Sequence, residues 1–349
     1  MAVQCNTRFH FSPYLGEHSA TYPIFIRNKT MTAYNSLVQV PYSDFEFAVN
    51  EAFESKQPFS FIRLGDGEGA LLDFDEQCSL EDIEYLSEHV GKKATIEQLS
   101  TLKNNLEKAI DNTNIVGIRD DVLGVSFEEG LLKQNDEQVF LEAFKQAFTL
   151  RATELNICYS DARRIAKLYK AIKYNAYSHQ KLCTQWIPFD YFLSGALTNL
   201  LERAGEIGVV TARVNIPEKL RKALSINVIE HITPDKSARQ VGTLIPHYPD
   251  HFNRIKNEIN VKYPGMPYLV AAGLIGKGYC AEIQRQGGIA LDIGALIDCW
   301  DGRYSRPKVI ESKFNVKKTL MGKKKLPEEL KMTTENAKRL RELFRNTRK

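Results

Sequence analysis

Short hydrophobic runs alternate with amphipathic segments along most of the chain. The runs are bounded by polar turn residues and predict seven buried strands, at residues 59–64, 114–119, 154–160, 206–213, 225–232, 267–273 and 288–294. Helix-period patterns lie between or beside them, at residues 43–55, 96–110, 136–148, 190–204 and 279–286. Strands that are apolar throughout are usually covered on both faces, and helical connections favour parallel neighbours. The pattern therefore predicts a doubly wound, mostly parallel, Rossmann-like α/β sheet, whose ligands bind at the carboxyl ends of the strands.

The two ends of the chain differ from this alternating body. Residues 1–41 show no sustained period and predict an irregular leader, whereas residues 42–305 form the predicted α/β domain. Ser43 followed by Glu46 predicts a capping box at the start of the first helix. Residues 306–349 contain 15 Lys and Arg against 5 Asp and Glu, a local charge of +10 in a chain of net charge +4. We expect this last segment to be a basic, partly helical tail on a mildly acidic body.

Composition excludes several classes of protein. None of the hydrophobic runs in the 349 residues is long enough to span a membrane, and the first residues lack a signal sequence, so we expect a cytoplasmic protein. The six cysteines include no Cys-x-x-Cys pair, which argues against a zinc ribbon and a thioredoxin-type motif.

His231, His247 and His251 lack metal-ligand spacing, and we interpret them as loop or core residues. Trp186 and Trp300 are interpreted as core residues, with Trp300 the better candidate for stacking on a sugar.

The first predicted strand runs directly into a glycine-rich acidic segment. Gly65 and Gly67 allow backbone with positive φ, and Asp66 and Glu68 would project at the mouth of the sheet. Two carboxylates with water and phosphate oxygens are typical ligands of Mg²⁺ or Mn²⁺. The alternative is an ordinary Asp-Gly turn with solvated acids. Arg63, just before the glycines, either contacts phosphate or pairs with one of these acids.

A second glycine-rich segment follows the strand at residues 267–273. Gly273, Gly276 and Lys277 precede a helix, whose first N–H groups and positive dipole end suit a diphosphate. The segment lacks the spacing of a Walker A loop. Lys277 is either a cation for the diphosphate or a solvated side chain. Asp292 ends the last strand and is a candidate for binding ribose or acceptor hydroxyls, with helix capping as the alternative.

Three further polar residues follow predicted strands. Asp120 and its neighbour Asp121 lie beyond the second strand, where Asp120 is a candidate general base for an acceptor hydroxyl; capping a helix is the alternative. Arg213 is a candidate phosphate contact or a surface arginine. Asp298 shares the two interpretations given for Asp292.

The acidic segment resembles a known family. SFIRLGDGEGALL, with Arg63, Gly65, Asp66, Gly67 and Glu68, is similar to the signature of the GT-D class of glycosyltransferases, a bacterial family with a metal-binding Asp-x-Glu motif. LVAAGLIGKGYCAEIQRQGGIALDIGALID resembles a second, later segment of that family. The resemblance covers about residues 42–305. It implies a nucleotide-sugar donor, usually a uridine diphosphate (UDP) sugar, together with Mn²⁺ or Mg²⁺ and a glycan acceptor. The chain departs from the family at Ala295, where histidine is common, and at Gly69–Ala70, which would widen the pocket.

These observations favour a metal-dependent glycosyltransferase that uses a UDP-sugar in bacterial surface polysaccharide or glycoprotein assembly. Asp66 and Glu68 would hold the metal against the donor diphosphate. The basic tail suits an anionic membrane surface carrying a lipid-linked glycan acceptor, which would place the enzyme at the inner face of the membrane. We expect no nucleic-acid partner. The alternatives are a metal-dependent phosphohydrolase or nucleotidyltransferase, and a module that binds nucleic acid or membrane through its tail.

Overall fold

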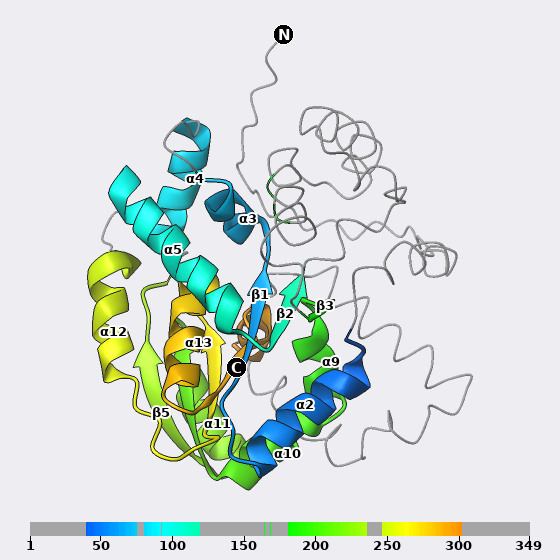
Figure 1. The fold of residues 1–349 in the computed structure, drawn as a ribbon. Helices are drawn as coiled ribbons and strands as arrows, with labels where there is room; N and C mark the ends of the chain where they lie inside the picture. The colour runs from blue at the N-terminus through cyan, green and yellow to red at the C-terminus, as the bar shows by residue number, and fades with distance from the viewer. Residues whose placement is uncertain are drawn as a thin grey trace, which may run out of the picture.

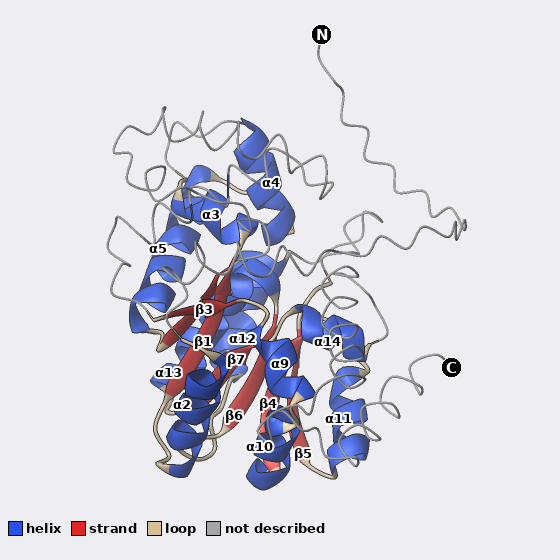
Figure 2. Ribbon diagram, turned by 90° about the vertical axis from the view of Figure 1, so that its right-hand side faces the viewer, coloured by secondary structure: helices blue, strands red, loops and turns tan. Residues whose placement is uncertain are grey.

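The computed structural model describes residues 40–74, 80–91, 93–118, 164, 168, 181–235 and 246–301. Within them, seven strands form one sheet in the order β3-β2-β1-β7-β6-β4-β5, and every neighbouring pair is parallel. The strands are β1 (Phe59–Leu64), β2 (Ile115–Ile118), β3 (Leu182–Thr184), β4 (Glu206–Thr211), β5 (Asn227–Ile232), β6 (Pro267–Ala271) and β7 (Ile289–Asp292). Figure 2 shows these strands running side by side between layers of helices. The predicted Rossmann-like α/β fold is confirmed.

Helices cover both faces of the sheet (Figure 1). The first layer contains α3 (Asp66–Leu72), α4 (Leu80–Val90), α5 (Ile96–Asn112), α12 (Phe252–Glu258) and α13 (Gly276–Arg285). The second contains α2 (Tyr42–Glu54), α9 (Ile187–Leu193), α10 (Ala196–Ala204), α11 (Ile216–Leu224) and α14 (Ala295–Trp300). Two short segments, η2 (His247–His251) and η3 (Gly273–Ile275), precede α12 and α13. Each layer buries its own hydrophobic cluster against the sheet, which explains why the strands are apolar throughout.

The order of the strands brings together the two glycine-rich segments. The chain places β1, β2 and β3 on one side, then forms β4 and β5 on the other, and returns through β6 and β7 into the middle. Consequently β7 pairs with β1, with Phe61 opposite Leu291. Because the sheet is parallel, the carboxyl ends of β1, β7 and β6 lie at one edge.

Local details differ from the sequence predictions at several places. α2 begins at Tyr42, one residue earlier than expected, so Ser43 lies inside the helix and caps nothing; its hydroxyl bonds to Asp44 instead. The helix predicted at 190–204 is two helices, because Gly195 adopts φ 88° between α9 and α10. β3 was not predicted. The strand expected at 154–160, the helix expected at 136–148 and the segment from 306 onward lie outside the described residues.

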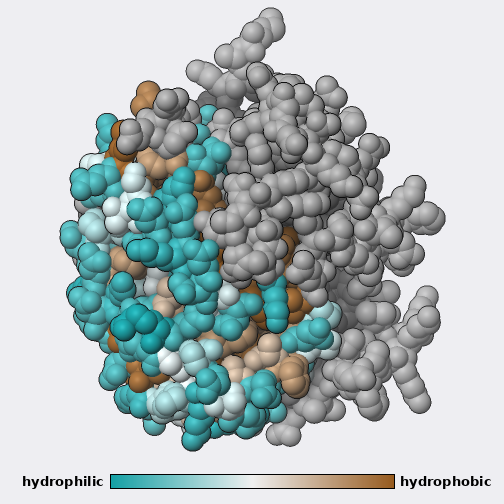
Figure 3. All heavy atoms as spheres, in the orientation of Figure 1, coloured by the Kyte–Doolittle hydropathy of each residue, from teal (hydrophilic) through white to brown (hydrophobic). Residues whose placement is uncertain are grey.

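In the view of Figure 3, hydrophilic side chains dominate the described surface and hydrophobic ones are scattered among them. None of the described helices combines the length and apolar character that a membrane span requires.

Candidate functional site

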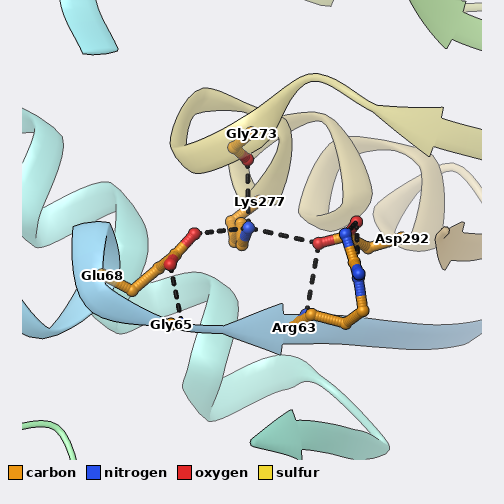
Figure 4. A network of polar contacts seen from close by, with 6 residues as sticks. All are labelled: Arg63, Gly65, Glu68, Gly273, Lys277 and Asp292. Carbon is orange, nitrogen blue, oxygen red and sulfur yellow. Dashed lines mark hydrogen bonds and ion pairs between the residues drawn. The ribbon is translucent and has the colours of Figure 1, made fainter. Parts of the chain in front are cut away.

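Four ionised side chains meet at the carboxyl edge of the sheet. Arg63 comes from β1, Glu68 from α3, Lys277 from α13 and Asp292 from β7, and Figure 4 shows them as one chain of contacts. The carboxylate of Asp292 lies between the two cations, and the ammonium of Lys277 lies between the two carboxylates. Two positive and two negative groups compensate one another, as buried charges require.

Lys277 is fully enclosed in this network. Its side chain is 5% exposed, and its Nζ lies 2.5 Å from Oε1 of Glu68, 3.2 Å from Oδ2 of Asp292 and 3.0 Å from the carbonyl oxygen of Gly273. An ammonium group has three N–H donors, and each has an oxygen here. The sequence interpretations of Lys277 were a cation for the diphosphate and a solvated side chain; the structure instead shows a buried lysine that ties α13 to α3 and β7.

Arg63 pairs with Asp292 rather than with the acids of its own segment. Its Nε and Nη2 both lie 3.1 Å from Oδ1 of Asp292, and its backbone N–H donates to Oδ2 at 3.2 Å. Gly294 makes room for this pair, because a Cβ added there would come within 1.5 Å of Nη2 of Arg63. Gly294 also has φ 40°, in the region that favours glycine. The sequence Asp292-Ile293-Gly294 thus has a structural explanation: Asp292 pairs with Arg63 of β1, and Gly294 leaves room for the arginine side chain.

The pKa values of Lys277 and Asp292 follow from their pairing. Burial alone would lower the pKa of Lys277, but the carboxylates of Asp292 and Glu68 outweigh burial and raise it. Burial likewise would raise the pKa of Asp292, but Arg63 and Lys277 hold it below its ordinary value. Both residues are therefore ionised near neutral pH. Cys280, buried beside them, has a pKa raised well above its ordinary value by burial, so it is an unreactive thiol.

The segment Gly65–Gly69 is not the open loop that its glycines suggested. α3 begins at Asp66, and none of these three glycines has a positive φ. Close packing explains two of them: a Cβ on Gly67 would touch the ring of His89, and one on Gly69 would lie 2.0 Å from the backbone oxygen of Arg164. The expectation that Gly69–Ala70 widens a pocket is therefore wrong, because the chain's own backbone fills that space.

Asp66 and Glu68 have different surroundings although they are two residues apart. Glu68 is 6% exposed; its Oε2 accepts the backbone N–H of Gly65 at 2.8 Å, and its Oε1 faces Lys277. Asp66 is only half-buried, and its Oδ2 accepts the hydroxyl of Tyr85 at 2.5 Å. The two carboxylates thus stand on the first turn of α3, one sealed inside the network and the other near the surface.

Tyr85 and Asp82 of α4, together with Arg164, support Asp66, and they were not identified from the sequence. The guanidinium of Arg164 lies over the ring of Tyr85 at 3.6 Å from its centroid. Arg164 is itself buried, and its Nη2 lies 3.3 Å from Oδ1 of Asp82. The contact with Arg164 holds the ring of Tyr85, and the hydrogen bond to Asp66 holds its hydroxyl. The only sequence signal was the helical period that places Asp82 and Tyr85 one turn apart.

Two carboxylates of the described residues stay the candidates for holding a divalent cation. No group of three or more His, Cys, Asp or Glu side chains suited to a metal occurs among those residues. Mg²⁺ and Mn²⁺ are often held by one or two carboxylates, with water and substrate phosphates completing the sphere. Asp66 and Glu68 both lie on the first turn of α3, where Asp66 accepts from Tyr85 and Glu68 contacts Gly65 and Lys277.

The loop after β6 remains suited to a phosphate group. Gly273 is exposed and has φ 59°, and a Cβ added to it would meet no atom within 4 Å. It stands next to the first turn of α13, whose first N–H group, that of Gly276, donates to the carbonyl oxygen of Gly273. Gly276 is different, because it is buried and its position lies close to Val270. Backbone at Gly273, rather than the side chain of Lys277, is thus presented to the outside.

Other predicted residues lie apart from the network or outside the described chain. Asp120 and Asp121 are outside it. Arg213 lies between two carboxylates, with Nε 2.7 Å from Asp298 and Nη1 2.5 Å from Asp235, so it links the ends of β4 and β5 to α14. Trp300 is buried edge-on against Phe192, which rules out stacking on a sugar.

Trp186, His231 and His247 belong to the core and His251 is partly buried, in line with the interpretation of these residues as core or loop residues. Trp186 is buried beside Phe189. His247 is buried and bonded to the hydroxyl of Tyr279, and the ring of His231 stacks on Tyr268. His251 contacts the carbonyl oxygen of the last residue of β5.

The fold and the site define an α/β protein with a charged cluster at the carboxyl edge of a parallel sheet. A family model described as a GT-D fold-like domain matches residues 46–173, which include Arg63, Asp66 and Glu68. This match supports the assignment of the chain to the GT-D-type family, and the domain has a glycosyltransferase-like fold. Neither curated proteins nor solved structures gave a match. The second glycine-rich segment lies beyond residue 173, outside the range that the family model matches. Its contact with the first segment is therefore known from the structure and not from the family match.

Proposed function

We propose that this protein is a metal-dependent glycosyltransferase that uses a nucleotide-sugar donor, with UDP as the expected nucleotide. The supporting observation is the junction of the two glycine-rich segments: the motif of the GT-D-like domain, ending in Glu68, is joined through Lys277 to the loop that follows β6. Parallel α/β sheets bind their ligands at this edge. The acceptor that we propose is a glycan or a lipid-linked glycan, used in bacterial surface polysaccharide or glycoprotein assembly.

The chain's own residues would bind and orient the donor in the following way. Asp66, braced by Tyr85, would hold Mn²⁺ or Mg²⁺, which would neutralise the charge that develops on the departing nucleoside diphosphate. The backbone at Gly273 would meet the phosphates. The network of Arg63, Asp292, Lys277 and Glu68 would keep these two elements at a fixed separation before the substrate arrives.

Deprotonation of the acceptor needs a base, and Asp120 stays our candidate for it in an inverting reaction. β2 lies beside β1, with Ile118 opposite Leu64, so the chain leaves β2 at the same edge as the motif. The basic segment 306–349 would bring the enzyme to an anionic membrane surface at which a lipid-linked acceptor is held.

The experiment is a thermal-shift screen of nucleoside diphosphates with and without Mn²⁺, followed by assay of UDP release from UDP-hexoses. A ligand present at 100 times its Kd stabilises the folded state by about 2.7 kcal/mol. We expect UDP with Mn²⁺ to give the largest shift and added oligosaccharide acceptor to raise UDP release. Asp66→Asn should lower turnover at least ~100-fold by removing the cation's charge partner. Asp44→Asn, an exposed change on α2, serves as the matched control and should have no effect.

Two outcomes would contradict this proposal. If no nucleotide stabilises the wild-type protein, with or without Mn²⁺, the site does not bind a nucleotide-sugar donor. If UDP release proceeds at the same rate without any acceptor, and free sugar accumulates, the protein is a hydrolase of the kind named as the first alternative.

A further inference from the structure

We propose that His247 and Tyr279 are positioning residues for the loop after β6, and that they act through the hydrogen bond between them. The inference rests on the proposed function, because this loop is the part of the chain that we expect to meet the donor diphosphate. His247 belongs to a segment of η2 and α12, residues 247–252, which we call the strap. The strap packs on α4, η3 also contacts α4, and α12 lies beside α13 (Figure 1).

The strap is fixed at both of its ends. Gly91, the residue after α4, has φ 91°, and a Cβ added to it would lie 3.2 Å from the backbone nitrogen of His247. Near the other end, Nε2 of His251 lies 3.1 Å from the carbonyl oxygen of Ile232, the last residue of β5. The strap is thus seated on a helix and on the sheet, and its side chains have a defined place from which to hold α13.

The strap holds α13 through Tyr279. The buried Nε2 of His247 lies 2.9 Å from the hydroxyl oxygen of Tyr279, and the two rings stack with their centroids 5.9 Å apart. Phe252 packs on the same tyrosine, with ring centroids 5.1 Å apart. A Cβ added to Gly278 would lie 2.7 Å from the ring of Phe252, so only glycine lets the strap approach α13 this closely. Burial raises the pKa of Tyr279, so its hydroxyl keeps its proton and the bond.

Tyr279 and Lys277 anchor opposite sides of the first turn of α13. Residues two apart in an α-helix lie about 200° apart around its axis. Lys277 is held by Glu68 and Asp292, whereas Tyr279 is held by the strap. With two opposed anchors the turn cannot tilt about either one, and the Gly273 loop, which leads into this turn, is held with it.

The expected consequence is an indirect effect on nucleotide binding. His247 and Tyr279 are buried, so neither side chain is presented to the ligand. A loop that is already ordered in the free protein binds more tightly than one that must be ordered on binding. Loss of the bond between His247 and Tyr279 should therefore weaken UDP binding beyond its effect on folding.

The test is calorimetric titration of the full-length protein with UDP in the presence of Mn²⁺, using two matched tyrosine variants. Tyr279 and Tyr268 are both 0% exposed, and the hydroxyl of Tyr268 donates to the carbonyl oxygen of Asn260 at 2.8 Å. Tyr268 lies near the start of β6, at the end of the strand opposite the loop. Tyr279→Phe and Tyr268→Phe each remove one buried hydrogen bond and should lower the Tm similarly. Only Tyr279→Phe should weaken UDP binding, by about 3- to 10-fold, the range expected for one hydrogen bond.

A double-mutant cycle tests whether the two residues act through their common bond. His247→Phe should weaken UDP binding by a factor similar to that of Tyr279→Phe. In the double variant the two losses should not add, because each single change already removes the same bond. Circular dichroism and the Tm verify folding, and the matched tyrosine variants carry the test if His247→Phe does not fold.

The inference fails if UDP binds Tyr279→Phe as tightly as the wild type, or if Tyr268→Phe loses as much affinity as Tyr279→Phe. It also fails if the losses of His247→Phe and Tyr279→Phe add fully in the double variant. In each of these cases the wild-type protein binds UDP and the proposed function stands. A wild-type protein that binds no UDP would refute the proposed function, and this inference with it.

Discussion

Replacing Asp292 by asparagine removes the carboxylate at the centre of the buried network while keeping its shape. Asp292 is 3% exposed and faces Arg63 and Lys277, whose side chains are 14% and 5% exposed. After the change, Lys277 keeps only the carboxylate of Glu68, and Arg63 loses the carboxylate with which it is paired. Removing one partner of a buried ion pair typically costs about 3–5 kcal/mol, because the remaining charge is left uncompensated. We therefore expect the free energy of unfolding to fall by about 3–5 kcal/mol.

Thermal and urea unfolding measure this loss. At about 2 °C per kcal/mol for a domain of this size, the Tm should fall by at least about 6 °C. The control is Glu258→Gln, which breaks an exposed pair with Arg254 one helical turn away and should cost less than about 0.5 kcal/mol. If Asp292→Asn melts within 1–2 °C of the wild type, on the scale of the control, the network is not a buried, mutually compensated unit and the reasoning about this site fails.

The same carboxylate predicts a pH dependence. The pKa of Asp292 is held below its ordinary value of 3.8, so the unfolded chain takes up a proton before the folded one as the pH falls. The stability that Asp292 contributes is thus fully present above its unfolded pKa of about 4 and is lost as the pH falls through its lower folded pKa. Asp292→Asn has no carboxyl group to protonate at this position and should not show this loss of stability at low pH. The difference in the free energy of unfolding between the wild type and Asp292→Asn should therefore shrink below about pH 4.

Three further predictions concern other parts of the chain. Gly294→Ala should lower the free energy of unfolding by about 1–3 kcal/mol or more, and by more than Gly205→Ala does. Both glycines have a positive φ, but only at position 294 would the new Cβ collide with Arg63. Equal losses in urea unfolding would show that the contact with Arg63 is not tight. His231 is buried, its Nε2 has no hydrogen-bond partner among the described residues, and burial lowers its pKa, so stability should fall as the pH drops below about 6.5. His231→Phe should remove that slope between pH 8 and 5, and an unchanged slope would contradict the assignment. Deletion of residues 306–349 should reduce binding to anionic liposomes at low salt and preserve turnover of a soluble acceptor; unaltered liposome binding would refute the membrane role.

The architecture was predictable from the sequence because its cause is local. Each strand that packs between two helical layers must be apolar throughout, and that requirement is visible in runs such as residues 59–64 and 288–294. β3 escaped prediction because three residues carry too little of this signal. The helix that begins at Asp66 was not predicted, because glycine has a low helix propensity. Gly69 is needed in this helix because a larger residue would collide with the backbone of Arg164.

The sequence by itself determined the class of sheet and the family resemblance of the motif around Asp66 and Glu68; the edge at which ligands bind stays a prediction. Only the tertiary structure decided the partner of each charge. Arg63 and Asp292 are 229 positions apart, and no local pattern indicates that they meet. Their pairing depends on the return of the chain through β6 to β7 beside β1, which also encloses Lys277 between two carboxylates. A lone charged residue in a sequence does not show whether it lies buried or in water, since burial is a property of the packed elements around it.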